Sequence, residues 1–119
     1  MRAKDALGRS GEQAAVQYLE RAGLRILDRN WRCADGEIDI VAAERQVLVV
    51  CEVKTRTSGQ FGSPLEAVSK TKQARLRRLA ARWLVAQGIL FDEVRLDVIG
   101  LTRDAAGRFV VEHVRGVGQ

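Results

Sequence analysis

The sequence predicts an α/β fold, a three-layer sandwich in which helices cover both faces of a mixed sheet. One observation is helical periodicity in two stretches, residues 5–22 and 65–87. Another is five runs of strand character, which give the element order αβββαββ. Because a helix separates the third and fourth strands, the chain can cross over there, and we expect those two strands to be parallel neighbours.

The first helix is predicted from residue 5 to residue 22, where apolar side chains such as Val16 and Leu19 recur at three- and four-residue spacing. Gly23 is its expected C-terminal cap, because glycine accepts the left-handed conformation that often ends a helix. A first strand is predicted over residues 24–30.

The second and third strands are predicted to form an antiparallel hairpin. The run GEIDIVA alternates carboxylates with isoleucines, and the run VLVVCEVKTR is apolar on both faces for most of its length, which is typical of a central strand. If residues 43–46 are the connection, Asp39 lies opposite Val50 and diagonal to Glu52.

The second half of the chain begins with a loop that contains glycine, serine and the single proline, Pro64. Gly88 is expected to end the helix that follows, and the turn DAAG separates the last two strands. The predicted bounds are 57–64 for the loop, 65–87 for the helix, and 93–101 and 109–114 for the strands.

Length and charge indicate a small basic domain. The 119 residues are expected to form one domain, 1–119, with flexible ends at about 1–6 and 115–119. A net charge of +5 favours a polyanionic partner. The charged N-terminus lacks the apolar centre of a secretory signal, and no apolar run approaches the roughly 18 residues of a membrane span. We therefore expect a cytoplasmic protein that does not enter a membrane.

Cysteine and histidine are too scarce for several classes of site. Cys33 and Cys51 lie in unlike settings, and we expect Cys51 to be a small core residue rather than part of a disulfide. Because His113 is the only histidine, neither a zinc site nor a Ser-His-Asp triad is expected. A metal ion would have to be bound by oxygen atoms.

Carboxylates and one lysine are expected to gather at the end of the hairpin. Glu52 and Lys54 share one face of their strand because successive side chains alternate. Asp39 lies across the hairpin, and Glu12 continues the buried stripe of the first helix. Such oxygen ligands select hard cations, Mg²⁺ or Mn²⁺, which can lower the pKa of water and neutralise a phosphodiester. The alternatives are a surface ion pair between Glu52 and Lys54 and a helix end at which Glu12 reaches solvent.

Four blocks of the sequence closely resemble the YraN-like protein family. They are GxxGExxAxxYLExxGLxIL at 8–27, GEIDIVA at 36–42, VCEVKTR at 50–56 and FGSPLEAVSKTKQARLRRLA at 61–80. That family is placed in the PD-(D/E)xK nuclease superfamily, has a restriction-endonuclease-like fold and is similar to Holliday-junction resolvases.

The resemblance implies roles for the acidic residues. Asp39 would be the aspartate of the motif, and Glu52 and Lys54 would be its (D/E)xK pair. An isoleucine stands before Asp39 in place of the proline that gives the motif its name. Glu12 would match a helical glutamate that assists the metal, and the backbone carbonyl of Val53 would be a further ligand.

The second helix carries basic residues and no acid between residues 70 and 82. Phosphate binding would relieve the repulsion among these charges, although a solvated helix face is the alternative. Trp31 and Trp83 are expected in the core rather than stacked on bases, and Asp97 is either a site residue or a structural one. The residues predicted to contact nucleic acid are Lys70, Lys72, Arg75, Arg78 and Arg82 on the helix, and Thr55, Arg56 and Ser58 on the preceding loop.

The leading hypothesis is a divalent-metal-dependent nuclease that hydrolyses phosphodiester bonds in DNA, including branched or structured DNA. The alternatives are a non-catalytic nucleic-acid-binding module and an adaptor in a DNA repair or recombination complex, which would bind a larger protein of that complex. The resemblance to resolvases also implies a homodimer, because a four-way junction has two-fold symmetry and needs two cuts.

Overall fold

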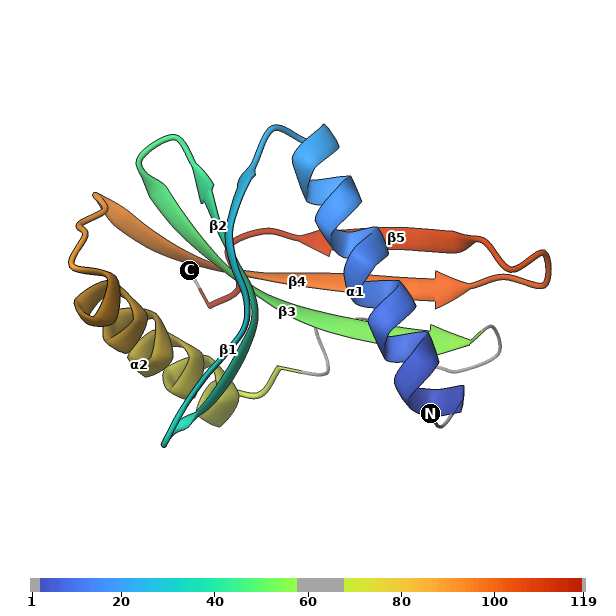
Figure 1. Ribbon diagram of the computed structural model, residues 1–119, viewed down its shortest axis with the longest axis horizontal. Helices are drawn as coiled ribbons and strands as arrows, with labels where there is room; N and C mark the ends of the chain where they lie inside the picture. The colour runs from blue at the N-terminus through green and yellow to red at the C-terminus, as the bar shows by residue number, and fades with distance from the viewer. Residues whose placement is uncertain (1–2, 58–67, 119) are drawn as a thin grey trace.

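The computed structural model describes residues 3–57 and 68–118 and confirms the predicted α/β fold and element order. The strands in the described part of the chain form one sheet in the order β1-β2-β3-β4-β5 (Figure 1). Neighbours are antiparallel except β3 and β4, which are parallel, as the crossover predicted. The elements are α1 (Ala3–Arg21), β1 (Arg25–Cys33), β2 (Gly36–Glu44), β3 (Val47–Thr57), α2 (Lys70–Gln87), β4 (Glu93–Arg103) and β5 (Phe109–Val114).

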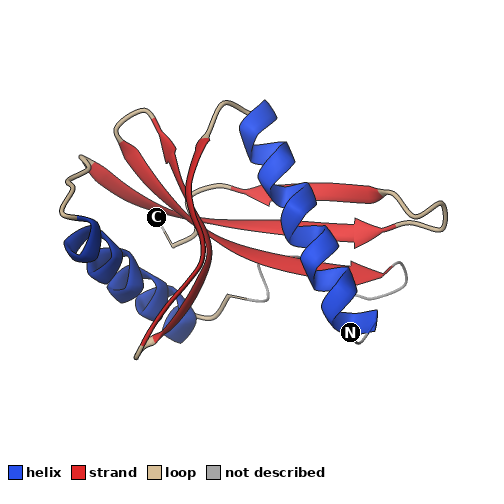
Figure 2. Ribbon diagram, viewed as in Figure 1, coloured by secondary structure: helices blue, strands red, loops and turns tan. Residues whose placement is uncertain are grey.

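The two helices cover opposite faces of the sheet and make it the middle of three layers (Figures 1 and 2). The core on the α1 side contains Leu19 and Val49, and the core on the α2 side contains Val50, Leu79 and Trp83. Neighbouring residues of β3 therefore enter different cores. This arrangement explains why the run VLVVC is apolar without alternation.

Helix α2 begins later than predicted. Ser69 is its N-cap, with a side chain that accepts a hydrogen bond from the backbone nitrogen of Lys72 at 3.1 Å. Lys70 is therefore the first helical residue instead of residue 65, and Val68 and Ser69 are not helical. At the other end Gly88 takes the left-handed conformation, with a φ of 67°, as predicted. The predicted loop residues 58–64, and residues 65–67, lie outside the described residues.

The hairpin between β2 and β3 closes more tightly than predicted. Its turn consists of Arg45 and Gln46, and Arg45 has a φ of 55°. The four-residue connection was therefore wrong, and the register is shifted by two positions. Val50 pairs with Val41 and not with Asp39.

Strand β2 leaves β3 beyond the pair Ile40–Cys51, whereas β1 and β2 stay paired to their far end. The β1–β2 hairpin bends toward α2 there (Figure 1). Asn30, on β1, has a φ of 52° at this bend. Ile38 and Ile40 are two residues apart and yet enter opposite cores. The bend leaves Asp39 between the two faces of the sheet.

Asp97 on β4 has a structural role. Its carboxylate accepts hydrogen bonds from Arg95 Nε at 2.9 Å and the backbone nitrogen of Gly116 at 3.1 Å, and it lies 2.7 Å from His113 Nε2. Burial by itself favours a higher pKa for the Asp97 carboxyl. The hydrogen bonds from these partners together have the larger effect, so the pKa of Asp97 is lower than its usual value. Val117 is buried next to this cluster, and its backbone N–H donates a hydrogen bond to the carbonyl oxygen of Leu96 at 2.8 Å. The chain is therefore packed on the sheet at Val117, which lies inside the end, about 115–119, that was expected to be flexible.

Other core predictions are confirmed. Cys51 is fully buried, and burial raises the pKa of its thiol. Trp83 is buried and donates its indole N–H to Asp28 Oδ2 at 2.9 Å, while Trp31 packs partly buried against the α2-side core. Within residues 3–57 and 68–118, neither helix is long and apolar enough to cross a membrane.

Candidate functional site

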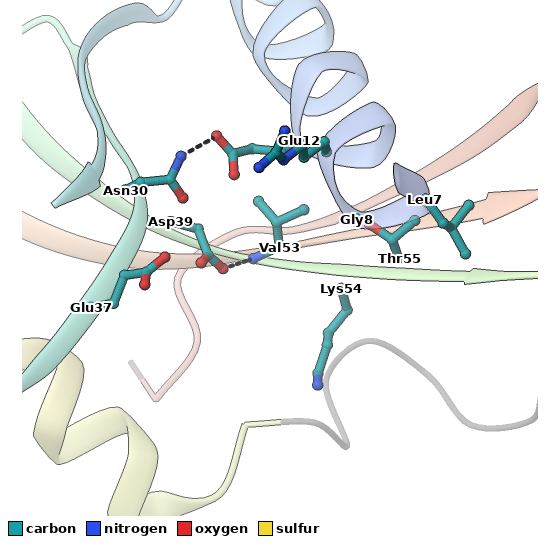
Figure 3. A pocket seen from close by; sticks show the side chains of 10 residues that line it. Leu7, Gly8, Glu12, Asn30, Glu37, Asp39, Val53, Lys54 and Thr55 are labelled. Carbon is teal, nitrogen blue, oxygen red and sulfur yellow. Dashed lines mark hydrogen bonds between the residues drawn. The ribbon is translucent and has the colours of Figure 1, made fainter. Parts of the chain in front are cut away.

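Asp39 lies where strands β2 and β3 separate. Because β2 separates from β3 beyond the pair Ile40–Cys51, the backbone N–H of Val53 on β3 has no partner on β2. The Asp39 carboxylate takes that place and accepts the hydrogen bond through Oδ2 at 2.8 Å (Figure 3). The break in the sheet therefore fixes the position of the carboxylate.

The surroundings of Asp39 oppose its ionisation. Its pKa is raised from 3.8 to about 7, most strongly by burial and further by the negative charges of Glu52, Glu37 and Glu12. The hydrogen bond from Val53 acts in the opposite direction and is outweighed. A carboxyl group that is half protonated near neutral pH, among other acids, marks a site with excess negative charge. A bound cation would relieve that charge.

Glu52 lies on the α2 side of β3 and is held by a lysine. Its Oε1 is 2.6 Å from Nζ of Lys72, a residue of the first turn of α2. The pair lines a cavity of about 310 Å³ together with Glu37, Asp39 and Arg75. Helix α2 therefore brings positive charge directly to the acids.

Glu12 lies on the opposite side of the sheet, on α1. Its Oε1 accepts hydrogen bonds from Asn30 Nδ2 at 2.8 Å and from Arg29 Nε at 3.1 Å. Helix α1 approaches β3 closely because Gly11 has no side chain, and a methyl group there would collide with Thr55. This close contact brings Glu12 to the same cleft as Asp39.

A cleft of about 490 Å³ joins most of the predicted site residues. Glu12, Asp39, Val53, Lys54 and Thr55 all line it. Figure 3 shows Glu12 and Lys54 on opposite sides of β3, with Asp39 between them. Asp39 also lines the cavity that contains Glu52, so it connects the two parts of the site.

The donor chemistry fits a hard cation, because carboxylate oxygens are the ligands that Mg²⁺ and Mn²⁺ prefer. The arrangement does not yet form a metal site, since no three acidic, histidine or cysteine side chains in the described part of the chain are close enough to share one ion. The separation follows from the sheet between Glu12 and Glu52, and an ion pair holds each of them on its own side. Lys72 holds Glu52 on one side of the sheet, and Arg29 holds Glu12 on the other.

The structure divides the residues that were predicted to contact nucleic acid. Lys72 and Arg75 face the acids, whereas Arg82 pairs with Asp35 in the β1–β2 turn at 2.9 Å. The other two predicted residues of α2, Lys70 and Arg78, are exposed. On β3, Thr55 lines the cleft and Arg56 is partly buried; Ser58 lies outside the described residues.

Three partners of the acids were missed in the sequence. Arg29 and Asn30 fall in a predicted strand, where nothing in the pattern indicated a bend. The one signal was the identity of Asn30, because asparagine tolerates positive φ better than most residues do. Lys72 was predicted to bind phosphate, and its ion pair with Glu52 has no signature in the local sequence.

Comparison with known proteins confirms the family resemblance. Residues 11–101 match the model of the "Uncharacterised protein family UPF0102". A UPF0102 protein of Beutenbergia cavernae is 56% identical over 118 residues, which cover 99% of this chain and 100% of that protein. A UPF0102 protein of a Nocardioides species is 51% identical over 115 residues, which cover 97% and 93% of the two chains. The chain therefore belongs to the UPF0102 family.

Proposed function

We propose that this protein is a divalent-metal-dependent nuclease that hydrolyses phosphodiester bonds in DNA. The observation that supports this most directly is the partly buried Asp39, whose pKa is raised to about 7 by burial and by neighbouring carboxylates. Structural burial does not require several acids around one carboxyl group. A cation-binding site does require them.

The acidic residues would hold the cation. Asp39 and Glu52 would supply carboxylate oxygens, with Glu12 and the backbone carbonyl of Val53 as further ligands. When bound, Mg²⁺ or Mn²⁺ supplies positive charge against the phosphodiester and increases the acidity of water. Glu12 would have to move away from Arg29, because that contact holds it apart from the other acids.

Positive side chains would bind and orient the substrate. Lys54 lies in the cleft with Asp39, where its ammonium group can orient the attacking water or stabilise charge that develops on the phosphate. Arg75 lines the neighbouring cavity from α2. The exposed basic side chains of that helix would attract the rest of the DNA backbone.

One observation favours a second candidate, a nucleic-acid-binding module without catalysis. In the described residues no three acids are close enough to share one ion, and Glu12 and Glu52 are each paired with a cationic side chain of the protein. Such a site can be stable without any metal. This candidate predicts salt-sensitive DNA binding that is unchanged by Glu52→Ala, whereas the nuclease requires Glu52 for turnover.

A cleavage assay separates the two candidates. The substrates are a labelled four-way junction and its matching linear duplex, each with Mn²⁺ or with EDTA, and the proteins are the wild type and Glu52→Ala. Metal-dependent cutting that disappears in the variant supports the nuclease and shows whether branching matters. Equal binding of the junction by both proteins, with no cutting under any condition, would reject the nuclease in favour of the binding module.

A further inference from the structure

Lys72 and Glu52 form the closest ion pair around the candidate site, among the described residues. The distance from Nζ to Oε1 is 2.6 Å, and the side chains are 34% and 10% exposed. Lys72 is also fixed at its backbone, because Ser69 caps the first turn of α2 through the Lys72 N–H. The ammonium group is therefore placed on Glu52 by the start of a helix.

This contact satisfies a need that the fold creates. Glu52 ends the buried run of β3, and a buried carboxylate without a partner is strongly destabilising. Asp39 lies beside it on the strand that leaves the sheet, and its negative charge repels that of Glu52. A positive charge from outside the sheet stabilises Glu52 beside Asp39.

A lysine and a divalent cation cannot meet that requirement at the same oxygen atoms. Hard cations bind carboxylate oxygens directly, and Lys72 occupies Oε1 of Glu52. Two positive charges on one carboxylate also repel each other. A cation can therefore use Glu52 fully only after the ammonium group has moved away.

We propose that Lys72 is a positioning residue that holds Glu52 in the absence of a divalent cation and exchanges with that cation when it binds. This inference rests on the proposed function, because it concerns the same acids. It assigns to Lys72 a role distinct from the phosphate contact predicted for the helix as a whole. The exchange makes cation affinity weaker than the acids alone would give and keeps the empty site stable.

The test is direct titration of the metal-free protein with Mn²⁺, by calorimetry and without nucleic acid. Lys72→Met and the more polar Lys72→Gln remove the competing charge, Lys72→Arg keeps it, and Lys70→Met removes a charge from the same helical turn. We expect Lys72→Met and Lys72→Gln to bind Mn²⁺ about three- to tenfold more tightly than the wild type, as the strength of a partly exposed ion pair implies. Lys72→Arg and Lys70→Met should stay within about twofold of it.

Thermal unfolding gives a second readout. Without Lys72, Glu52 loses its ion-pair partner, so in EDTA both neutral variants should unfold at a lower temperature than the wild type. Saturating Mn²⁺ should then raise their unfolding temperature by more than it raises that of the wild type, because tighter binding to the folded state gives a larger stabilisation. Equal Mn²⁺ shifts in all proteins would contradict the exchange.

The outcomes also separate this inference from the proposed function. Unchanged Mn²⁺ affinity in both neutral variants, with metal-dependent cleavage by the wild type intact, overturns the role of Lys72 alone. A wild type that neither binds Mn²⁺ nor cleaves DNA overturns the inference and the proposed function together.

Discussion

The carboxyl group of Asp39 should make the stability of the folded protein fall as pH rises through neutrality. Its pKa is raised from 3.8 to about 7, first by burial and then by neighbouring carboxylates. Between these values the folded protein holds a proton that the unfolded chain has lost. The stabilisation is therefore fully present below pH 3.8 and is lost as pH rises through about 7. Asp39→Asn removes this titration, and its side-chain oxygen can still accept the hydrogen bond from Val53.

The size of the effect follows from the two pKa values. At pH 5 the folded protein is almost fully protonated at this group and the unfolded chain is mostly ionised, whereas by pH 8 both are ionised. A single group with this shift lowers the free energy of unfolding by about 2 to 3 kcal/mol between pH 5 and pH 8. Asp39→Asn should therefore gain about that much stability relative to the wild type over the same interval.

Urea unfolding in EDTA, followed by tryptophan fluorescence from Trp83 at pH 5, 6, 7 and 8, measures this difference. Asp92→Asn, at an exposed position, controls for the loss of one carboxylate from the surface. A stability difference between Asp39→Asn and the wild type that stays flat within about 0.5 kcal/mol from pH 5 to 8 would refute the reasoning. Addition of Mn²⁺ at pH 8 should stabilise the wild type and not Asp39→Asn, because the cation would neutralise the carboxylate that the variant lacks.

Three further predictions concern other parts of the structure. Asp97→Ala should lower the free energy of unfolding by about 3 to 5 kcal/mol in urea at pH 7, because it leaves buried partners unpaired; a loss below about 1 kcal/mol would contradict this. Gly11→Ala should lower it by about 1 to 3 kcal/mol through collision with Thr55, whereas Gly8→Ala, where no atom of the described residues lies within 4 Å of the added methyl group, should raise it by about 0.5 to 1 kcal/mol. Similar thermal melts for the two glycine variants would argue against the close packing of α1. Lys54→Met should slow single-turnover cleavage with Mn²⁺ by about 100-fold or more at nearly unchanged melting temperature, and an unchanged rate would exclude Lys54 from the reaction.

The order and type of the elements could be predicted because they depend on local patterns. The run from Val47 is apolar on both faces, which identified it as a central strand, and Gly88 identified the end of α2. The hairpin turn could not be predicted in the same way. Arg45 has a positive φ, a conformation that glycine or asparagine usually adopts in a hairpin turn. An arginine at this position gave no indication of a two-residue turn. The resulting error of two positions in register changed the β3 partner of each of the residues 40–44 of β2.

Most of the catalytic and metal-binding residues proposed from the sequence line one cleft, but their arrangement could not be predicted. Alternation along a strand, which is a local rule, predicted Glu52 and Lys54 on one face; Glu52 lines the cavity beside α2, and Lys54 lines the cleft that also contains Glu12. The position of Asp39 depends instead on where β2 leaves β3, which is decided by the packing of the bent hairpin against α2. The pairing of Lys72 with Glu52 joins residues 20 positions apart and follows only from the way the helix packs on the sheet.

The separation of β2 from β3 links the fold to the proposed chemistry. A regular ladder would have paired the N–H of Val53 with a backbone oxygen and left no place for a carboxylate. At the bend the N–H of Val53 donates its hydrogen bond to the Asp39 carboxylate instead of to a backbone oxygen. Asp39 is thereby placed where the two cores meet. Each side of the sheet then contributes a further acid together with a cationic partner, Glu12 with Arg29 and Glu52 with Lys72. Each partner neutralises one acid and leaves the charge on Asp39 uncompensated, so the proposed cation would bind at Asp39 and would recruit Glu12 and Glu52 only when those ion pairs open.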